Sequence, residues 1–147
     1  MELAVNPESM NRPSKNQLFV WGKNDYGQLG LGDDAKDKVI TDPKKLNVSE
    51  IAWTQVACGL FHTAAVSSNG EAFTWGWGGF GQLGHGDRRN RSVATKVEIP
   101  GGEAVVKIAC GTRHTAAVTG AGKLFTWYVS SCYNHFFYSF INQMNTG

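Results

Sequence analysis

The chain repeats a long glycine-rich motif, and this internal repeat limits the possible fold more than any other feature of the sequence. Residues 21–32, Trp-Gly-Lys-Asn-Asp-Tyr-Gly-Gln-Leu-Gly-Leu-Gly, match residues 75–86 at seven of twelve positions. Residues 58–75 match residues 110–127 at eleven of eighteen positions. Repeats of about 20 to 50 residues or slightly more are typical of solenoids and propellers, whose units bury their apolar faces against one another. We therefore expect an assembled surface, not one catalytic centre, to carry the function.

Each repeat predicts short β-strands separated by glycine-containing turns. The strands are expected at 18–21, 51–58, 62–66, 71–75, 104–110, 114–118 and 123–127. Asn69-Gly70 stands between two of them, and Asn-Gly is a strong signal for a hairpin. No stretch between residues 18 and 127 keeps a 3.6-residue apolar period, so helices should be short or absent. The sequence predicts an all-β chain built of hairpins.

The repeated residues resemble a known family. The motif Trp-Gly followed by Gly-Gln-Leu-Gly, then Cys-Gly-x-x-His-Thr-Ala-Ala-Val and Phe-Thr-Trp, is similar to the repeat of the regulator of chromosome condensation family. The resemblance covers roughly residues 18–127. It implies a seven-bladed β-propeller with four-stranded blades, of which this chain would form a partial β-propeller of about two blades.

The length of the chain divides it into three expected parts. Residues 1–17 are expected to be a disordered lead-in, and residues 18–127 to hold repeat 1 (about 18–70), repeat 2 (about 71–122) and the start of a third (123–127). Seven units of about 52 residues need roughly 360 residues, and the chain has 147. We therefore expect a fragment of a longer propeller or a piece that completes itself by association.

The last part, residues 128–147, departs from the repeat. Tyr128 stands where the pattern requires the glycine found at 22 and 76, and no Asp, Glu, Lys or Arg follows. Six of these twenty residues are aromatic. Our hypothesis is that this tail is out-of-pattern coding.

Charge and composition limit the classes of partner. A net charge of +2 gives no reason to expect nucleic acid or chromatin as the partner. The first 17 residues lack the apolar segment of a signal peptide, and the apolar run at 135–141 is too short to span a membrane. We expect a cytoplasmic or nuclear protein whose partners are proteins, with no role at a membrane.

Three motifs that could suggest chemistry have simpler structural interpretations. Gly76-x-Gly78-x-x-Gly81 matches a dinucleotide fingerprint formally, but no helix can start in the Gln-Leu-Gly-His-Gly that follows. The Cys-x-x-x-His pairs at 58–62 and 110–114 recur at the repeat period, so His62 and His114 are expected to tie strands together by ring hydrogen bonds instead of binding zinc. No serine stands out as a nucleophile beside these histidines. We predict no catalytic, cofactor-binding or metal-binding residues.

The candidate partner-binding residues are those that break the repeat. Trp21, Trp75 and Trp127 occupy one repeat position and are predicted to be core. Trp53 and Trp77 align with Val105 and Lys23, so they are candidates for an exposed role in binding a partner. Arg88, Arg89 and Arg91 form a basic cluster in the loop where repeat 1 has Asp34-Ala-Lys-Asp37, and could contact acidic protein or phosphate.

The resemblance implies three functional classes. We expect a protein-interaction scaffold that binds through propeller loops. The alternative is guanine-nucleotide exchange on a Ran-like small GTPase, although no segment matches the wedge that would carry it. Light sensing, as in the plant ultraviolet-B photoreceptor of the same fold, is disfavoured because Leu60 and Thr112 replace the tryptophan of its Gly-Trp-Arg-His-Thr segments.

Overall fold

The computed structural model describes residues 3–6, 16–48 and 50–128, and this part of the chain is all-β, as predicted. The strands are β1 (Leu3–Asn6), β2 (Gln17–Lys23), β3 (Val39–Lys45), β4 (Trp53–Cys58), β5 (His62–Ser67), β6 (Ala72–Gly76), β7 (Arg91–Lys96), β8 (Val105–Cys110), β9 (Thr115–Thr119) and β10 (Leu124–Trp127). The helices in the described ranges are two 3-10 turns, η1 (Asp33–Ala35) and η2 (Pro100–Gly102). Neither is long and apolar enough to cross a membrane. The tail expected at 128–147 lies outside the described residues after Tyr128.

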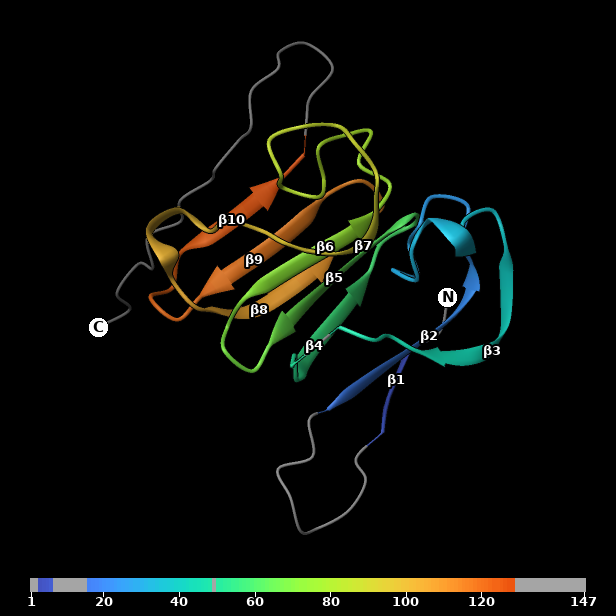
Figure 1. Ribbon diagram of the computed structural model, residues 1–147. Helices are drawn as coiled ribbons and strands as arrows, with labels where there is room; N and C mark the ends of the chain where they lie inside the picture. The colour runs from blue at the N-terminus through green and yellow to red at the C-terminus, as the bar shows by residue number, and fades with distance from the viewer. Residues whose placement is uncertain (1–2, 7–15, 49, 129–147) are drawn as a thin grey trace, which may run out of the picture.

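Three antiparallel sheets follow one another along the chain (Figure 1). Their strand orders are β1-β2-β3, β4-β5-β6-β7 and β8-β9-β10. The middle sheet is a four-stranded blade that runs from residue 53 to residue 96, so it takes β4 and β5 from repeat 1 and β6 and β7 from repeat 2. A blade is therefore built from parts of two successive sequence repeats.

The outer strands β3 and β7 were not among the predicted strands, because they lack an apolar pattern. β3 reads Val-Ile-Thr-Asp-Pro-Lys-Lys and is exposed at six of its seven positions. Pro43 is compatible with this strand because β3 is the edge of its sheet in the described structure and needs no hydrogen bond on its outer side. β7 begins at Arg91, a residue that the sequence placed in a loop.

The prediction of a disordered lead-in over residues 1–17 is wrong for Leu3–Asn6, which form β1. β1 pairs with β2 in the register that β5 uses on β6: Val5 lies opposite Leu18 as Val66 lies opposite Ala72. Leu-Ala-Val-Asn of β1 therefore corresponds to Ala64-Ala-Val-Ser67 of β5. The strand is too short to show a period, and only this alignment with the repeat reveals it. Residues 7–15 lie outside the described part of the chain.

Two apolar cores lie on opposite faces of the middle sheet. One is shared with the first sheet and is built by Leu18, Val20, Leu29, Leu46, Trp53, Ala65, Phe73 and Trp75. The other is shared with the third sheet and is built by Val66, Ala72, Val97, Val105, Ala117, Phe125 and Trp127. Because both faces are covered, every residue of β5 and β6 is buried. Trp75 and Trp127 are core residues, as predicted, and Trp21 is half-buried.

The Gly-Gln-Leu-Gly motif of the β2–β3 loop docks against the next sheet. The main-chain oxygen of Gln28 accepts hydrogen bonds from Thr63 Oγ1 at 2.8 Å and from Trp75 Nε1 at 2.9 Å. Leu29 is fully buried beside them. Gly30 has φ +70°, and a Cβ at this position would lie 3.0 Å from Trp75 Nε1. Glycine is thus required at this position for two reasons: its positive φ is unfavourable for other residues, and the Trp75 indole leaves no room for a side chain.

The second copy of the motif docks against the third sheet with one of these two hydrogen bonds, because Trp127 Nε1 has no hydrogen-bond partner among the described residues. The main-chain oxygen of Gln82 accepts a hydrogen bond from Thr115 Oγ1 at 2.8 Å, and Leu83 is buried. A Cβ at Gly84 would lie 2.9 Å from Trp127. The repeat motif is therefore largely a description of how one sheet docks onto the next.

His62 ties the middle sheet to the third sheet, as predicted. Its Nε2 lies 2.9 Å from Thr115 Oγ1 in the buried interface. The hydroxyl proton of Thr115 goes to the Gln82 oxygen, so His62 donates from Nε2 and is the neutral Nε2–H tautomer. Burial lowers the pKa of His62 to about 4. Its counterpart His114 is exposed.

A pair of glycine variants tests the docking of the loop against Trp75. Gly30 and Gly32 both have positive φ, but nothing lies within 4 Å of a Cβ at Gly32. Gly32→Ala should therefore cost only the backbone strain, about 1–2 kcal/mol. Gly30→Ala should cost a further 1–3 kcal/mol or so, because its methyl group overpacks the indole. Urea unfolding measures both, and equal costs would contradict the close approach.

The buried His62 predicts a pH dependence of stability. The unfolded chain protonates this histidine below pH about 6.5, whereas the folded chain does not until pH about 4. The unfolded state binds more protons within this window, so stability falls as the pH falls, by up to about 3 kcal/mol. His62→Gln keeps a donor and removes the titration. Its unfolding free energy should fall less between pH 7 and 4 than that of the wild type, and parallel curves would contradict the assignment.

Candidate partner-binding surface

Four aromatic side chains gather at one end of the strands. Their ring centroids lie 4.9 Å apart for Tyr26 and Phe61, 5.7 Å for Tyr26 and Trp77, 5.9 Å for Phe61 and Trp77, and 5.0 Å for Trp77 and Phe80. All four are partly exposed. We call Tyr26, Phe61, Trp77 and Phe80 the aromatic surface.

Three loops from two neighbouring sheets supply these rings. Tyr26 lies in the β2–β3 loop, Phe61 in the β4–β5 loop, and Trp77 and Phe80 in the β6–β7 loop. The Trp77 amide donates to the Phe61 carbonyl at 2.8 Å, which holds two of the loops together. A Cβ at Gly79 would lie 2.7 Å from Trp77 Nε1, so the indole can occupy this position only because residue 79 has no side chain.

The repeat motif also positions Tyr26 and Phe80, which occupy the same repeat position. The side-chain oxygen of Gln28 accepts a hydrogen bond from the Tyr26 amide at 2.9 Å. Gln82 does the same for the Phe80 amide at 2.8 Å. Each glutamine therefore fixes one aromatic residue while its main-chain oxygen holds the next sheet.

A cation extends the aromatic surface onto the third sheet. The guanidinium carbon of Arg113, in the β8–β9 loop, lies 4.8 Å from the centroid of the Phe80 ring. This distance is within the range of a cation–π interaction. Leu60, beside Phe61, adds an apolar side chain that is 57% exposed. Such a mixture of aromatic residues and arginine is typical of the residues that dominate protein–protein binding energy.

The predicted arginine cluster lies next to Trp77. The side-chain oxygen of Asn90 accepts a hydrogen bond from the Gly78 amide at 3.0 Å, which fastens the arginine loop to the residue after Trp77. Arg91 forms a two-pronged ion pair with Asp87, with nitrogen–oxygen distances of 2.8 and 3.3 Å. Arg91 lowers the pKa of the Asp87 carboxyl through this hydrogen bonding. Arg91 therefore shapes the loop.

Arg88 and Arg89 are available to a partner. The side chain of Arg89 is 84% exposed and lies 3.6 Å from Asp87, a surface pair that contributes little to stability. Arg88 is also exposed. The structure thus brings Trp77, Arg88 and Arg89 to one end of a blade, and their role in binding stays a prediction.

Trp53 is not part of this surface, and the prediction that it is exposed is wrong. It is 3% exposed and packs on Phe73 and Trp75, with ring centroids 5.2 and 6.1 Å away. Its repeat counterpart Val105 is 2% exposed. The position is buried in both repeats, and the larger side chain fills more of the first core.

The sequence analysis missed Tyr26, Phe61, Phe80 and Arg113. Tyr26 and Phe80 carry a signal in the sequence, because both repeats place an aromatic residue three positions before the leucine of Gly-Gln-Leu-Gly, but a repeated position also fits a purely structural role. Phe61 and Arg113 share another repeat position and differ there. Their meeting with Trp77 and Phe80 depends on how the sheets dock.

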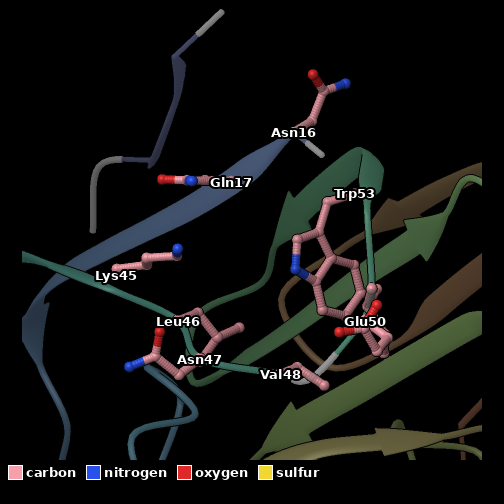
Figure 2. Close-up of a pocket in the computed structure, with 9 residues that line it drawn as sticks. Asn16, Gln17, Lys45, Leu46, Asn47, Val48, Glu50 and Trp53 are labelled. Atoms are coloured by element: carbon pink, nitrogen blue, oxygen red, sulfur yellow. The ribbon is translucent and has the colours of Figure 1, made fainter. Parts of the chain in front are cut away.

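Two hollows lie at the end of the strands that is opposite to the aromatic surface. They occupy matching positions of the two repeats. The larger, about 320 Å³, has the Trp53 indole on one side and Gln17 of β2 and Lys45 of β3 on the other (Figure 2). The smaller, about 220 Å³, has Glu71 and Lys96 at those two positions, joined by an ion pair of 2.8 Å. The first hollow has glutamine instead of this carboxylate.

The described residues do not offer a metal site. No group of three or more His, Cys, Asp or Glu side chains among them could hold a metal ion. Burial raises the pKa of Cys58 to about 11 and of Cys110 to about 12, so both thiols stay protonated at neutral pH and are poor ligands and nucleophiles.

The chain is similar to several proteins over most of its length. It is 46% identical over 114 residues to the ultraviolet-B receptor UVR8 of Arabidopsis thaliana, a match that covers 77% of this chain and 25% of the receptor. It is 40% identical over 117 residues to the human probable E3 ubiquitin-protein ligase HERC3, covering 79% of this chain and 11% of the ligase. The chain thus spans a quarter or less of the length of these relatives.

Comparison with solved structures supports the same relationship. The crystal structure of Prp20p from Saccharomyces cerevisiae superposes with a TM-score of 0.68 and 25% sequence identity, covering 78% of this chain and 30% of Prp20p. The family model of the regulator of chromosome condensation (RCC1) repeat matches residues 15–66 and 69–118. The two copies of the motif and the sheets built from them therefore place the chain in the RCC1 repeat family, as part of a β-propeller.

Proposed function

We propose that this chain is a protein-interaction module that binds its partners through the aromatic surface. The observation that carries the proposal is the gathering of four partly exposed rings from three loops of two sheets. Aromatic residues and arginine are enriched at the centres of protein interfaces because they bury a large area with few rotatable bonds. The loops are fixed by the docked repeat motif, so little ordering is needed when a partner binds.

The relatives support binding as the shared role. One relative is named as a receptor and the other as a probable ubiquitin ligase, so their activities differ. Both match this chain through the same repeats. We propose that the repeats supply recognition and that any catalytic activity in the longer relatives comes from other parts. Ultraviolet reception is not proposed for this chain, because Leu60 and Thr112 replace the tryptophans that the resemblance requires.

A second candidate is regulation of a small GTPase, with nucleotide exchange as the specific activity. The structure of Prp20p was described together with its binding to Gsp1p and histones, and Gsp1p is a GTPase. The test is the rate of nucleotide release from a panel of small GTPases. Acceleration by the chain supports exchange, whereas binding without acceleration supports the interaction module alone.

Truncation of the central ring tests the main proposal. Peptides are selected from a random library displayed on phage, with the whole chain as bait, and their dissociation constants are then measured by fluorescence anisotropy. Trp77→Ala should weaken binding by at least about tenfold, because the ring contacts the other three aromatic side chains but Gly78 and Asn90 keep the loop in place.

Val93→Ala is the control, since Val93 is an exposed apolar residue of the outer strand β7. It should change binding by less than about twofold. Far-ultraviolet circular dichroism verifies that both variants are folded. If the selected peptides bind the Trp77→Ala protein as tightly as the wild type, the aromatic surface is not the binding site.

A further inference from the structure

The charges around the aromatic surface indicate the chemistry of its partner. We propose that it binds an acidic segment of another protein, which presents Asp or Glu side chains to Arg88, Arg89 and Arg113 and an apolar side chain to the rings. This inference rests on the proposed function, since it names the kind of protein that the same surface takes.

The balance of charge at this end of the second repeat is strongly basic. Residues 87–91 and 113 hold four arginines and one aspartate. That aspartate is already engaged by Arg91 through two short contacts. The corresponding residues 33–38 of the first repeat hold three aspartates and two lysines, so the basic character is local to the second and third sheets. A partner therefore needs negative charge beside Trp77 and Phe80 in particular.

Arg113 is held in a suitable position for a carboxylate. The face of the Phe80 ring lies against the guanidinium group, 4.8 Å from its carbon to the ring centroid. Stacking on a ring leaves the N–H groups at the edge of the guanidinium plane free to donate two parallel hydrogen bonds. Arg113 and Phe80 thus bring a charged and an apolar binding group side by side.

Nucleic acid could offer phosphates to the same arginines, but the rings do not favour it. Proteins that bind single strands use aromatic faces on which bases stack. Here Phe61 and Phe80 meet Trp77 edge-on, with interplanar angles of 81° and 89°, and Tyr26 leans on both Phe61 and Trp77. The rings therefore pack against one another, and less of each ring face is accessible to a base.

Peptide selection on the whole chain tests the partner chemistry. The library of random peptides is selected separately on the wild type and on the Arg88→Glu/Arg89→Glu double variant, and binding of the recovered peptides is measured at low and high salt. We expect Asp and Glu next to aromatic or aliphatic residues in the peptides from the wild type. Binding of these peptides should fall at least about tenfold in the double variant and in Arg113→Glu, and should weaken at high salt.

Lys44→Glu/Lys45→Glu is the matched control. It makes the same change of charge at exposed residues of β3, at the other end of the strands. Binding by this control should stay within about threefold of the wild type. A mixed-sequence single-stranded DNA is measured in parallel as the phosphate probe.

The outcomes separate this inference from the proposed function. If the selected peptides are neutral or basic and their binding still depends on Trp77, the inference of an acidic partner is wrong, but the proposed interaction module is supported. Tighter, arginine-dependent binding of the DNA would overturn it in favour of a phosphate ligand. Equal weakening by the β3 control would show that only net charge matters, which also overturns it. If no recovered peptide depends on Trp77, both proposals fail.

Discussion

The main-chain oxygen of Gln28 is the point on which the arrangement of the first two sheets depends. It belongs to the loop of one sheet and accepts hydrogen bonds from Thr63 on β5 and Trp75 on β6 of the next. A buried carbonyl oxygen without a hydrogen-bond donor would reduce the free energy of unfolding. The two donors satisfy this oxygen and fix the position of the loop relative to the sheet. Leu29 then fills the core, and Gly30 admits the indole of Trp75. Between the second and third sheets, the Gln82 oxygen accepts the corresponding hydrogen bond from Thr115, but Trp127 Nε1 does not donate to it.

The same contact places the binding surface. Because the loop carrying Gln28 is pressed against the middle sheet, Tyr26 reaches Phe61 and Trp77, which belong to that sheet's loops. The side-chain oxygens of Gln28 and Gln82 fix the amides of the two repeat-related aromatic residues. Residues that stabilise the fold and residues proposed to bind a partner are thus neighbours in one loop, which lets the exposed positions vary while their geometry is retained.

Strands with buried faces could be predicted from the sequence, whereas exposed strands could not. The predicted strands at 62–66 and 71–75 agree with β5 and β6 to within one residue, because both repeat as short, mainly apolar runs and a glycine-containing turn joins them. β3 is mostly exposed and β7 is mostly half-buried, and both carry polar residues without an apolar pattern, so nothing in the sequence marks them as strands. Trp53 was misplaced because it has no repeat counterpart of the same type, although Val105 shows that the position is buried. Trp77 was found as a candidate, but its ring partners come from loops that only the docking of sheets brings together.

A double-mutant cycle at the shared carbonyl tests the central claim most directly. Thr63→Val and Trp75→Phe each remove one donor to the Gln28 oxygen while the other donor remains, and the double variant leaves it without either. Free energies of unfolding are measured for the four proteins in urea. The account predicts that the double variant loses more than the sum of the single losses, by about 0.5–3 kcal/mol. Losses that add to within about 0.5 kcal/mol would contradict it, because the two donors would then act independently of a common acceptor.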